Sequence, residues 1–186
     1  EAYKRSIRRH FKDWFLAKGL TSMTTIPNDS PGQFQALQEL QREGAMPARL
    51  RVYPIIPHSL PLSSVEILGL QTGLGDGMLR FGGVKLFVDN GWDGMSGSRS
   101  DLKWTREGLT DALTRCQRAG LQVIMHVVTA EGMALTLDCI EAARQAAPRA
   151  LRHRIDHLTP TDLAQIRRVR SLDVTLGITA PRVAPG

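Results

Sequence analysis

Three side chains that can bind metal or move protons follow one another along the chain, each in an apolar, strand-like segment. They are Lys85, His126 and His157. Lys85 interrupts the apolar run G-G-V-K-L-F-V-D, and burying an unpaired ammonium costs on the order of several kcal/mol. Four roles would explain it: a neutral base, a Schiff-base amine, an ion-pair partner of a carboxylate such as Asp89, or a carbamate that binds metal through oxygen.

The two histidines end their segments, His126 in L-Q-V-I-M-H-V-V and His157 in H-R-I-D-H. Neutral imidazoles at the ends of neighbouring parallel strands point into one opening, where nitrogens at about 2.0 to 2.1 Å can hold zinc. A single histidine at a strand end is usually a hydrogen-bonded core residue. Its recurrence after Lys85 in chain order favours one shared site, whereas His153 is expected beside that site or at the surface.

Short β-branched runs alternate with helix-periodic stretches, as in βα units that build a parallel sheet. The predicted strands are residues 20–26, 50–55, 84–88, 122–127, 154–157 and 174–178. The predicted helices are residues 31–43, 63–74, 105–119, 131–147 and 160–170, with Ser30-Pro31 and Thr159-Pro160 as two of the helix starts. The connection over residues 89–103 is long and glycine-rich. Asn90 and Trp92 in it are predicted to contact substrate, and Asp89 is predicted either to contact substrate or to hold the loop.

Composition predicts one folded domain over residues 1–186. The chain is 42% hydrophobic with a formal charge of +6, which excludes a disordered segment. No apolar run approaches the roughly 18 residues of a membrane helix, so no membrane partner is expected. Cys116 and Cys139 are expected to be buried helix thiols rather than a disulfide framework.

The basic residues are densest near the N-terminus, where an amphipathic helix is predicted. Its apolar stripe, expected to cover a core, is Ile7, Phe11, Trp14 and Phe15. The basic side chains, Lys4, Arg5, Arg8, Arg9 and Lys12, are interpreted as a solvated face. No nucleic-acid-binding motif accompanies them, so no nucleic-acid partner is predicted.

Five segments carry a resemblance to a known family. They are G-L-T-S-M-T, P-A-R-L-R-V-Y-P, L-R-F-G-G-V-K-L-F-V-D-N-G, A-G-L-Q-V-I-M-H, and H-R-I-D-H followed by T-P-T-D-L. In this order the chain resembles the middle of a metal-dependent amidohydrolase, nearest the branch of N-substituted formamide deformylase-like enzymes. The resemblance extends over about residues 1–178.

The resemblance implies an α/β fold, an incomplete (β/α)8 TIM-type barrel with roughly strands two to seven. It implies one or two divalent metal ions, with zinc expected. Lys85, which can be carbamylated in this family, His126 and His157 would be the metal ligands. Water activated by the metal would cleave nonpeptide C-N bonds in a small amide, formamide or cyclic amide.

Part of the family's site is expected outside the chain. The sequence has no H-x-H pair, and the proton-shuttling Asp is expected beyond Gly186, so no catalytic residue is predicted within it. The N- and C-terminal parts of the barrel are expected to be missing, which predicts a chain that is inactive alone and whose open sheet edges favour a homo-oligomer. With no secretion signal visible, a cytoplasmic location is predicted.

Two other functions stay open from the residues alone. One is a barrel lyase or aldolase in which Lys85 forms a Schiff base and His126 acts as acid or base. The other is a basic, nonenzymatic α/β binding module whose arginine-rich first helix contacts phosphates. Borohydride trapping at Lys85 identifies the first, and steeply salt-dependent binding of nucleic acid identifies the second.

Overall fold

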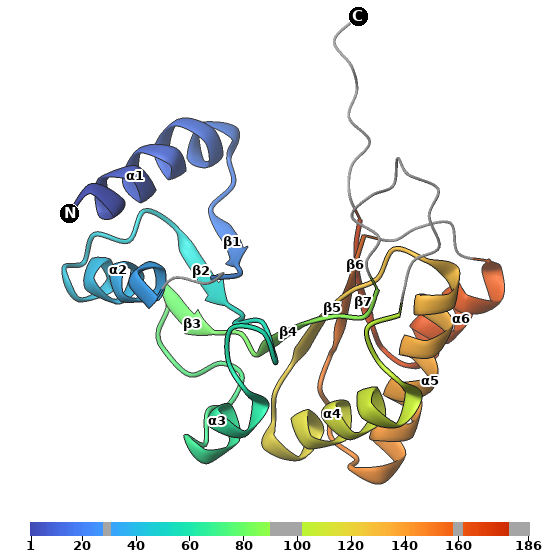
Figure 1. The fold of residues 1–186 in the computed structure, drawn as a ribbon. Coiled ribbons are helices and arrows are strands. Elements are labelled where there is room, and N and C mark those ends of the chain that lie inside the picture. Colours follow the sequence, from blue (N-terminus) through green and yellow to red (C-terminus); the bar gives the residue numbers. More distant parts are fainter. Residues whose placement is uncertain (28–30, 90–101, 158–161, 179–186) are drawn as a thin grey trace, which may run out of the picture. The chain divides into compact units, whose positions relative to one another are not determined.

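The computed structural model describes residues 1–27, 31–89, 102–157 and 162–178 (Figure 1). The chain divides into two compact units, Glu1–Val84 and Lys85–Gly186. In each unit strands alternate with helices along the chain, as predicted for an α/β protein. The single domain predicted over residues 1–186 stays a prediction.

The first unit holds a three-stranded sheet in the order β1-β2-β3, and its strands are parallel. Its elements are α1 (Ala2–His10), the π-helix η1 (Phe11–Phe15), the 3-10 helix η2 (Leu16–Lys18), β1 (Ser22–Thr25), α2 (Pro31–Arg42), β2 (Arg49–Val52), α3 (Leu62–Ile67) and β3 (Leu79–Phe81). Leucines of α2 and of the strands form its core, to which Leu40, Leu50 and Leu79 belong.

The first helix matches only part of its predicted pattern. Ile7 and Phe11 pack against the core, as expected. Trp14 is 62% exposed and Phe15 36% exposed, so the apolar stripe predicted to cover the core ends sooner than expected. Lys4, expected on the solvated face, is instead buried, because Glu39 of α2 and Glu43 just after this helix pair with its ammonium group.

The first unit also holds one helix that was predicted wrongly and one strand that was missed. The helix predicted over residues 63–74 ends at Ile67, and Gly69 follows with a left-handed φ of 61° that a helix does not continue. Strand β3 was not predicted. The Asp76 carboxylate, which accepts hydrogen bonds from the backbone N–H groups of Met78 and Leu79, forms the turn that leads into this strand.

The second unit holds a four-stranded sheet in the order β4-β5-β6-β7. Its elements are β4 (Val84–Phe87), α4 (Arg106–Ala119), β5 (Val123–His126), α5 (Ala130–Ala146), β6 (Arg154–Asp156), α6 (Leu163–Ser171) and β7 (Thr175–Gly177). Strands β5, β6 and β7 are parallel, with His126 beside Asp156 and Asp156 beside Gly177. Helices α4, α5 and α6 form a layer beside this sheet (Figure 1).

The sequence predicted the second unit closely because its helices have clear ends. Thr105 caps α4, whose left-handed C-cap is Gly120, and Thr129 caps α5. Cys116 and Cys139 are buried in these helices, as predicted. Asp162 caps α6, while the predicted start at Thr159-Pro160 lies outside the described residues. None of the described helices combines the length and apolar character needed to span a membrane.

Candidate metal centre

Lys85, His126 and His157 lie close together in the second unit's sheet, with the two histidines at the carboxyl ends of their strands. Lys85 is on β4, His126 is the last residue of β5, and His157 follows β6 directly. The ring centroids of the two histidines are 4.5 Å apart, and the charge of Lys85 contributes to lowering the pKa of both rings. The structure therefore brings the predicted residues together. Their role as metal ligands stays a prediction.

Lys85 is buried and pairs with a carboxylate that the sequence reasoning did not select. Its side chain is 2% exposed, and Nζ donates to Asp156 Oδ2 at 3.0 Å. Burial lowers the pKa of Lys85, and the charge of Asp156 opposes that shift. The sequence offered Asp89 as a possible ion-pair partner of Lys85, but the carboxylate that pairs with Lys85 is that of Asp156. The signal for Asp156 was present in H-R-I-D-H, where it directly precedes His157.

Asp156 serves two cations. Its other oxygen, Oδ1, accepts from Arg154 Nε at 2.6 Å. On the neighbouring strand, a Cβ at Gly177 would overlap this oxygen, so glycine leaves the space that the Asp156–Arg154 pair occupies. The cluster thus holds a lysine and an arginine against one carboxylate.

Both imidazoles are held in their neutral form. Burial, with smaller contributions from the neighbouring His157 and Lys85, lowers the pKa of His126 to about 4. Burial also lowers the pKa of His157, and the positive charge of Lys85 makes the second-largest contribution in the same direction. A neutral imidazole has a lone pair that can bind a metal, whereas an imidazolium does not. Near pH 7 the two rings are therefore in the state that metal binding needs.

The donor set fits a metal only if Lys85 changes its charge. Across the described residues no three His, Cys, Asp or Glu side chains gather as a metal site. Two imidazoles are in place, and the third predicted ligand is an amine paired with Asp156. An ammonium repels a cation, but a carbamate on the same nitrogen presents oxygens to it.

Phe87 forms an apolar wall next to these groups. It lies two residues after Lys85, and its ring centroid is 4.9 Å from that of His126 and 5.7 Å from Lys85 Nζ. Its backbone carbonyl accepts a hydrogen bond from the Trp104 indole at 2.9 Å. The sequence reasoning did not select Phe87. Its signal was the alternation of a strand, which puts residues 85 and 87 on one side.

The residues predicted to contact substrate are only partly described. Asn90 and Trp92 lie outside the described residues. Asp89 is 0% exposed, and its carboxylate accepts hydrogen bonds from Val128 and Thr129 at the turn after β5. The substrate contact predicted for Asp89 stays a prediction.

His153 lies at the opposite end of the sheet, just before β6. It is fully buried, which excludes the surface position considered for it. Its Nδ1 accepts a hydrogen bond from the Val123 N–H at 3.1 Å, and burial lowers the pKa of the ring to about 4. His153 therefore connects the starts of β5 and β6.

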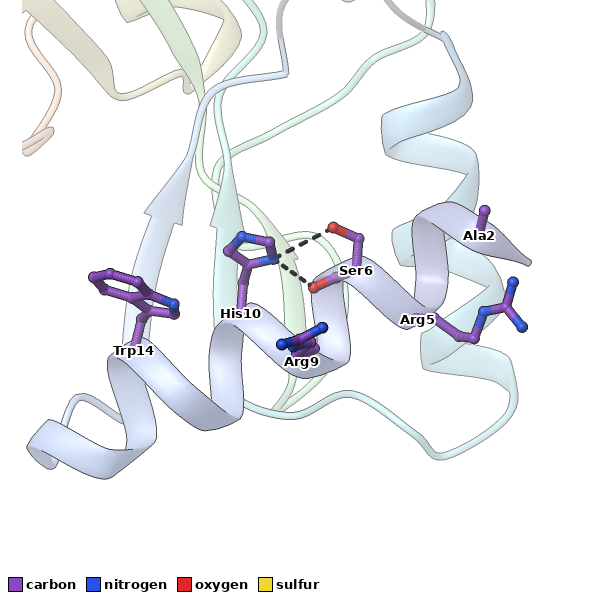
Figure 2. A pocket seen from close by; sticks show the side chains of 6 residues that line it. All are labelled: Ala2, Arg5, Ser6, Arg9, His10 and Trp14. Carbon is purple, nitrogen blue, oxygen red and sulfur yellow. Dashed lines mark hydrogen bonds between the residues drawn. The ribbon is translucent and has the colours of Figure 1, made fainter.

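An open hollow of about 630 Å³ lies on the first helix and is lined by six residues, Ala2, Arg5, Ser6, Arg9, His10 and Trp14 (Figure 2). The side chains follow one face of the helix, and His10 Nδ1 lies 2.9 Å from the Ser6 carbonyl oxygen. None of Lys85, His126 and His157 lines it. The hollow is therefore a surface feature of the first unit, separate in its residues from the candidate metal centre.

The family pattern described as the amidohydrolase family matches residues 1–185. The chain belongs to the amidohydrolase family. No curated protein matches it. Membership in this family does not by itself assign roles to Lys85, His126 and His157, which stay predictions. It does not favour the Schiff-base lyase or the basic binding module.

Two solved structures resemble this amidohydrolase chain. One is described as an uncharacterized metal-dependent hydrolase from Pyrococcus furiosus, with a TM-score of 0.77, 24% identity, and cover of 95% of this chain and 37% of the other. The other, described in the same words, is from Pyrococcus horikoshii OT3, with a TM-score of 0.77, 24% identity, and cover of 95% and 36%. This likeness confirms the predicted fold class, an α/β fold of the incomplete TIM-barrel type. The chain spans little more than a third of these structures.

Proposed function

We propose that the parent protein is a metal-dependent hydrolase of nonpeptide C-N bonds, and that this chain supplies Lys85, His126 and His157 to its metal centre. One observation carries the proposal: two neutral imidazoles with ring centroids 4.5 Å apart stand beside a buried lysine in an amidohydrolase chain. The proposed ion is divalent, with zinc favoured for nitrogen and oxygen ligands, and one or two ions are expected in the parent.

Lys85 is prepared for this role by its burial. With its pKa lowered, the amine loses a proton more readily, and its lone pair can form an N–C bond with carbon dioxide. The second proton then leaves the nitrogen, and a carbamate anion remains. Arg154 keeps its contact with Asp156, so the Asp156 carboxylate still has a cation when Lys85 has become negative.

His126 and His157 would hold the ion through ring nitrogens, with the carbamate oxygens of Lys85 as the third donor. When bound, the metal supplies Lewis-acid chemistry, since it lowers the pKa of water toward neutrality and polarises a carbonyl group. The Phe87 ring lies beside the His126 ring, with centroids 4.9 Å apart, and gives that side of the imidazole an apolar neighbour. The proton shuttle is proposed to be an Asp of the parent protein beyond Gly186.

The proposed substrate is a small amide, with formamides favoured through the resemblance to the N-substituted formamide deformylase-like branch. Asn90 and Trp92 are proposed substrate contacts, and Asp89 is proposed either as a third contact or as the residue that holds this loop. We also propose a cytoplasmic protein that binds neither nucleic acid nor membranes, and association of copies of this chain through sheet edges.

The test is an assay of the parent protein with N-formyl and N-acyl amines, with and without zinc, together with a mass measurement for one carbon dioxide on Lys85. We expect turnover that depends on the metal and is lost in Lys85→Ala. The 186-residue chain alone should not turn over these amines, because its sequence has no H-x-H pair. A parent protein that hydrolyses none of these amines, or one whose Lys85 becomes alkylated by a carbonyl substrate and borohydride, would contradict the proposal.

A further inference from the structure

Asp89 carries a buried carboxylate whose partners are backbone and hydroxyl donors. It is 0% exposed and follows β4 by two residues. The Val128 N–H donates to both of its oxygens, at 3.1 Å and 3.0 Å. The Thr129 N–H and hydroxyl donate to Oδ2 at 3.0 Å and 2.9 Å. A buried carboxylate is stable only with such donors, so its position is closely fixed.

These donors belong to the start of α5. Thr129 is the N-cap of this 17-residue helix, and its hydroxyl oxygen also accepts from the Gly132 N–H at 3.0 Å. A Cβ at Gly132 would overlap Asp89 Oδ2, so the first helical turn lies directly against the carboxylate. The positive end of the helix dipole favours a negative charge at this place.

The same contact lies beside His126. The Val88 N–H donates to the His126 carbonyl oxygen at 3.0 Å, and Asp89 binds the chain two and three residues further on. Two consecutive residues after β4 therefore hold the β5 chain on both sides of Val127. Lys85 lies four residues before Asp89 on the same stretch of chain, so this connection sets the distance between Lys85 and His126.

We propose that Asp89 is a positioning residue of the candidate metal centre: its carboxylate fixes the turn after β5 and so holds the His126 ring against Phe87 and beside Lys85. That this arrangement serves metal binding rests on the proposed function. The position of the ring itself can be tested without metal. Asp89 acts here through Val128 and Thr129 and does not touch the reacting atoms.

The experiment is NMR spectroscopy of the full 186-residue chain without metal, comparing wild type with Asp89→Asn. Asparagine keeps the shape of the side chain but turns an N–H toward the backbone N–H groups. We expect the amide protons of Val128 and Thr129 to exchange at least about tenfold faster, because one of the two acceptor oxygens becomes an NH2 donor and the other loses its negative charge. We also expect the ring-proton signals of His126 to shift, because the ring leaves the face of Phe87.

Thr129→Val and Thr105→Val give a milder, matched pair. Each removes the cap hydroxyl of one helix, at α5 and α4 respectively, but only Thr129 also donates to Asp89. The His126 ring signals should shift in Thr129→Val, stay in place in Thr105→Val, and return to their wild-type positions in Thr129→Ser, which keeps the hydroxyl. If Asp89→Asn does not fold, this pair decides the question.

Unchanged His126 ring signals in folded Asp89→Asn, or in Thr129→Val where only that pair folds, would overturn the proposal. Zinc titration of the same samples is a separate readout, and we expect about tenfold weaker binding in Asp89→Asn. If wild type binds no zinc but the His126 ring still moves in the variants, the positioning role stands and the proposed metal centre fails. If wild type and Asp89→Asn bind zinc equally well and the His126 ring signals do not move, the positioning role fails and the proposed metal centre stands.

Discussion

The two units each bury one lysine, and they treat it differently. Lys4 in the first unit is 6% exposed and has three carboxylates around Nζ, Glu43 at 2.5 Å, Glu1 at 2.8 Å and Glu39 at 3.2 Å. These contacts, that with Glu1 first, raise the pKa of Lys4. Lys85 in the second unit is 2% exposed, and its one carboxylate within ion-pair distance among the described residues, Asp156, also binds Arg154. Burial lowers the pKa of Lys85.

The difference lies in the supply of negative charge. A lysine with several carboxylates stays a cation and joins elements, as Lys4 joins α1 to α2. A lysine that shares its carboxylate can become neutral without leaving a strongly unbalanced charge behind, since Arg154 remains with Asp156. Burial alone thus does not distinguish the two lysines. We propose that the number of counter-charges around a buried lysine is the better guide to its reactivity.

Removal of a carboxylate from each lysine should give the largest contrast. Asp156→Ala leaves Lys85 buried without a counter-charge, and we expect the free energy of unfolding to fall by about 3 to 5 kcal/mol. Glu43→Ala should cost clearly less, because Lys4 keeps Glu1 and Glu39. Urea unfolding followed by circular dichroism measures both losses. Equal losses would show that the two lysines are bound in the same way.

Acid should weaken the second unit, because its buried histidines are held neutral. Burial, together with the nearby charge of Arg144, lowers the pKa of His153 from 6.5 to about 4. The unfolded chain takes up the proton as the pH falls through about 6.5, whereas the folded chain takes it up only near 4. Stability is therefore full above pH 6.5 and falls between 6.5 and 4, by on the order of 3 kcal/mol for this residue.

The histidine variant His153→Asn is the control for that loss. Between pH 6.5 and 4 the urea midpoint of this variant should fall less than the midpoint of wild type. His126, whose pKa is also lowered to about 4, supplies a further part of the same fall. A midpoint that does not change over this range in wild type would contradict the neutral, buried state of both rings.

A single methyl group should disturb the shared carboxylate to a smaller extent. In Gly177→Ala the new Cβ overlaps Asp156 Oδ1 and lies 3.1 Å from Arg154 Nε, so the pair must move. We expect a loss of about 1 to 3 kcal/mol, as for an overpacked site. Gly77→Ala is the control, because a Cβ there has nothing within 4 Å. A loss in Gly177→Ala no larger than in Gly77→Ala would show that Asp156 has room to shift.

The elements that the sequence predicted best are those with local signals at both ends. Helix α4 begins after Thr105 and ends before Gly120, within one residue of the prediction. Strand β3 has three residues and follows a turn made by Asp76, so it has no periodicity to detect. Helix α3 was predicted too long, because the apolar spacing continues beyond the left-handed Gly69 that ends it.

The order of the strands was enough to predict which three residues of the candidate site lie close together. Lys85 and His126 lie on successive strands and His157 directly follows the next one, and parallel strands put their carboxyl ends at one edge of the sheet. The partner of Lys85 was not predictable in this way. Asp156 is separated from Lys85 by 71 positions, and the two meet only through the pairing of β4 with β5 and of β5 with β6.

The proposed metal centre is tested most directly by titrating the full 186-residue chain with zinc in 13C-labelled bicarbonate and following the histidine ring signals by NMR. We predict that the signals of His126 and His157 change together, at the same zinc concentration, as a carbamate signal grows, while those of His153 stay in place. In His126→Ala the change at His157 should be lost. If zinc moves neither ring, or moves His157 equally in wild type and His126→Ala, the two histidines do not share an ion.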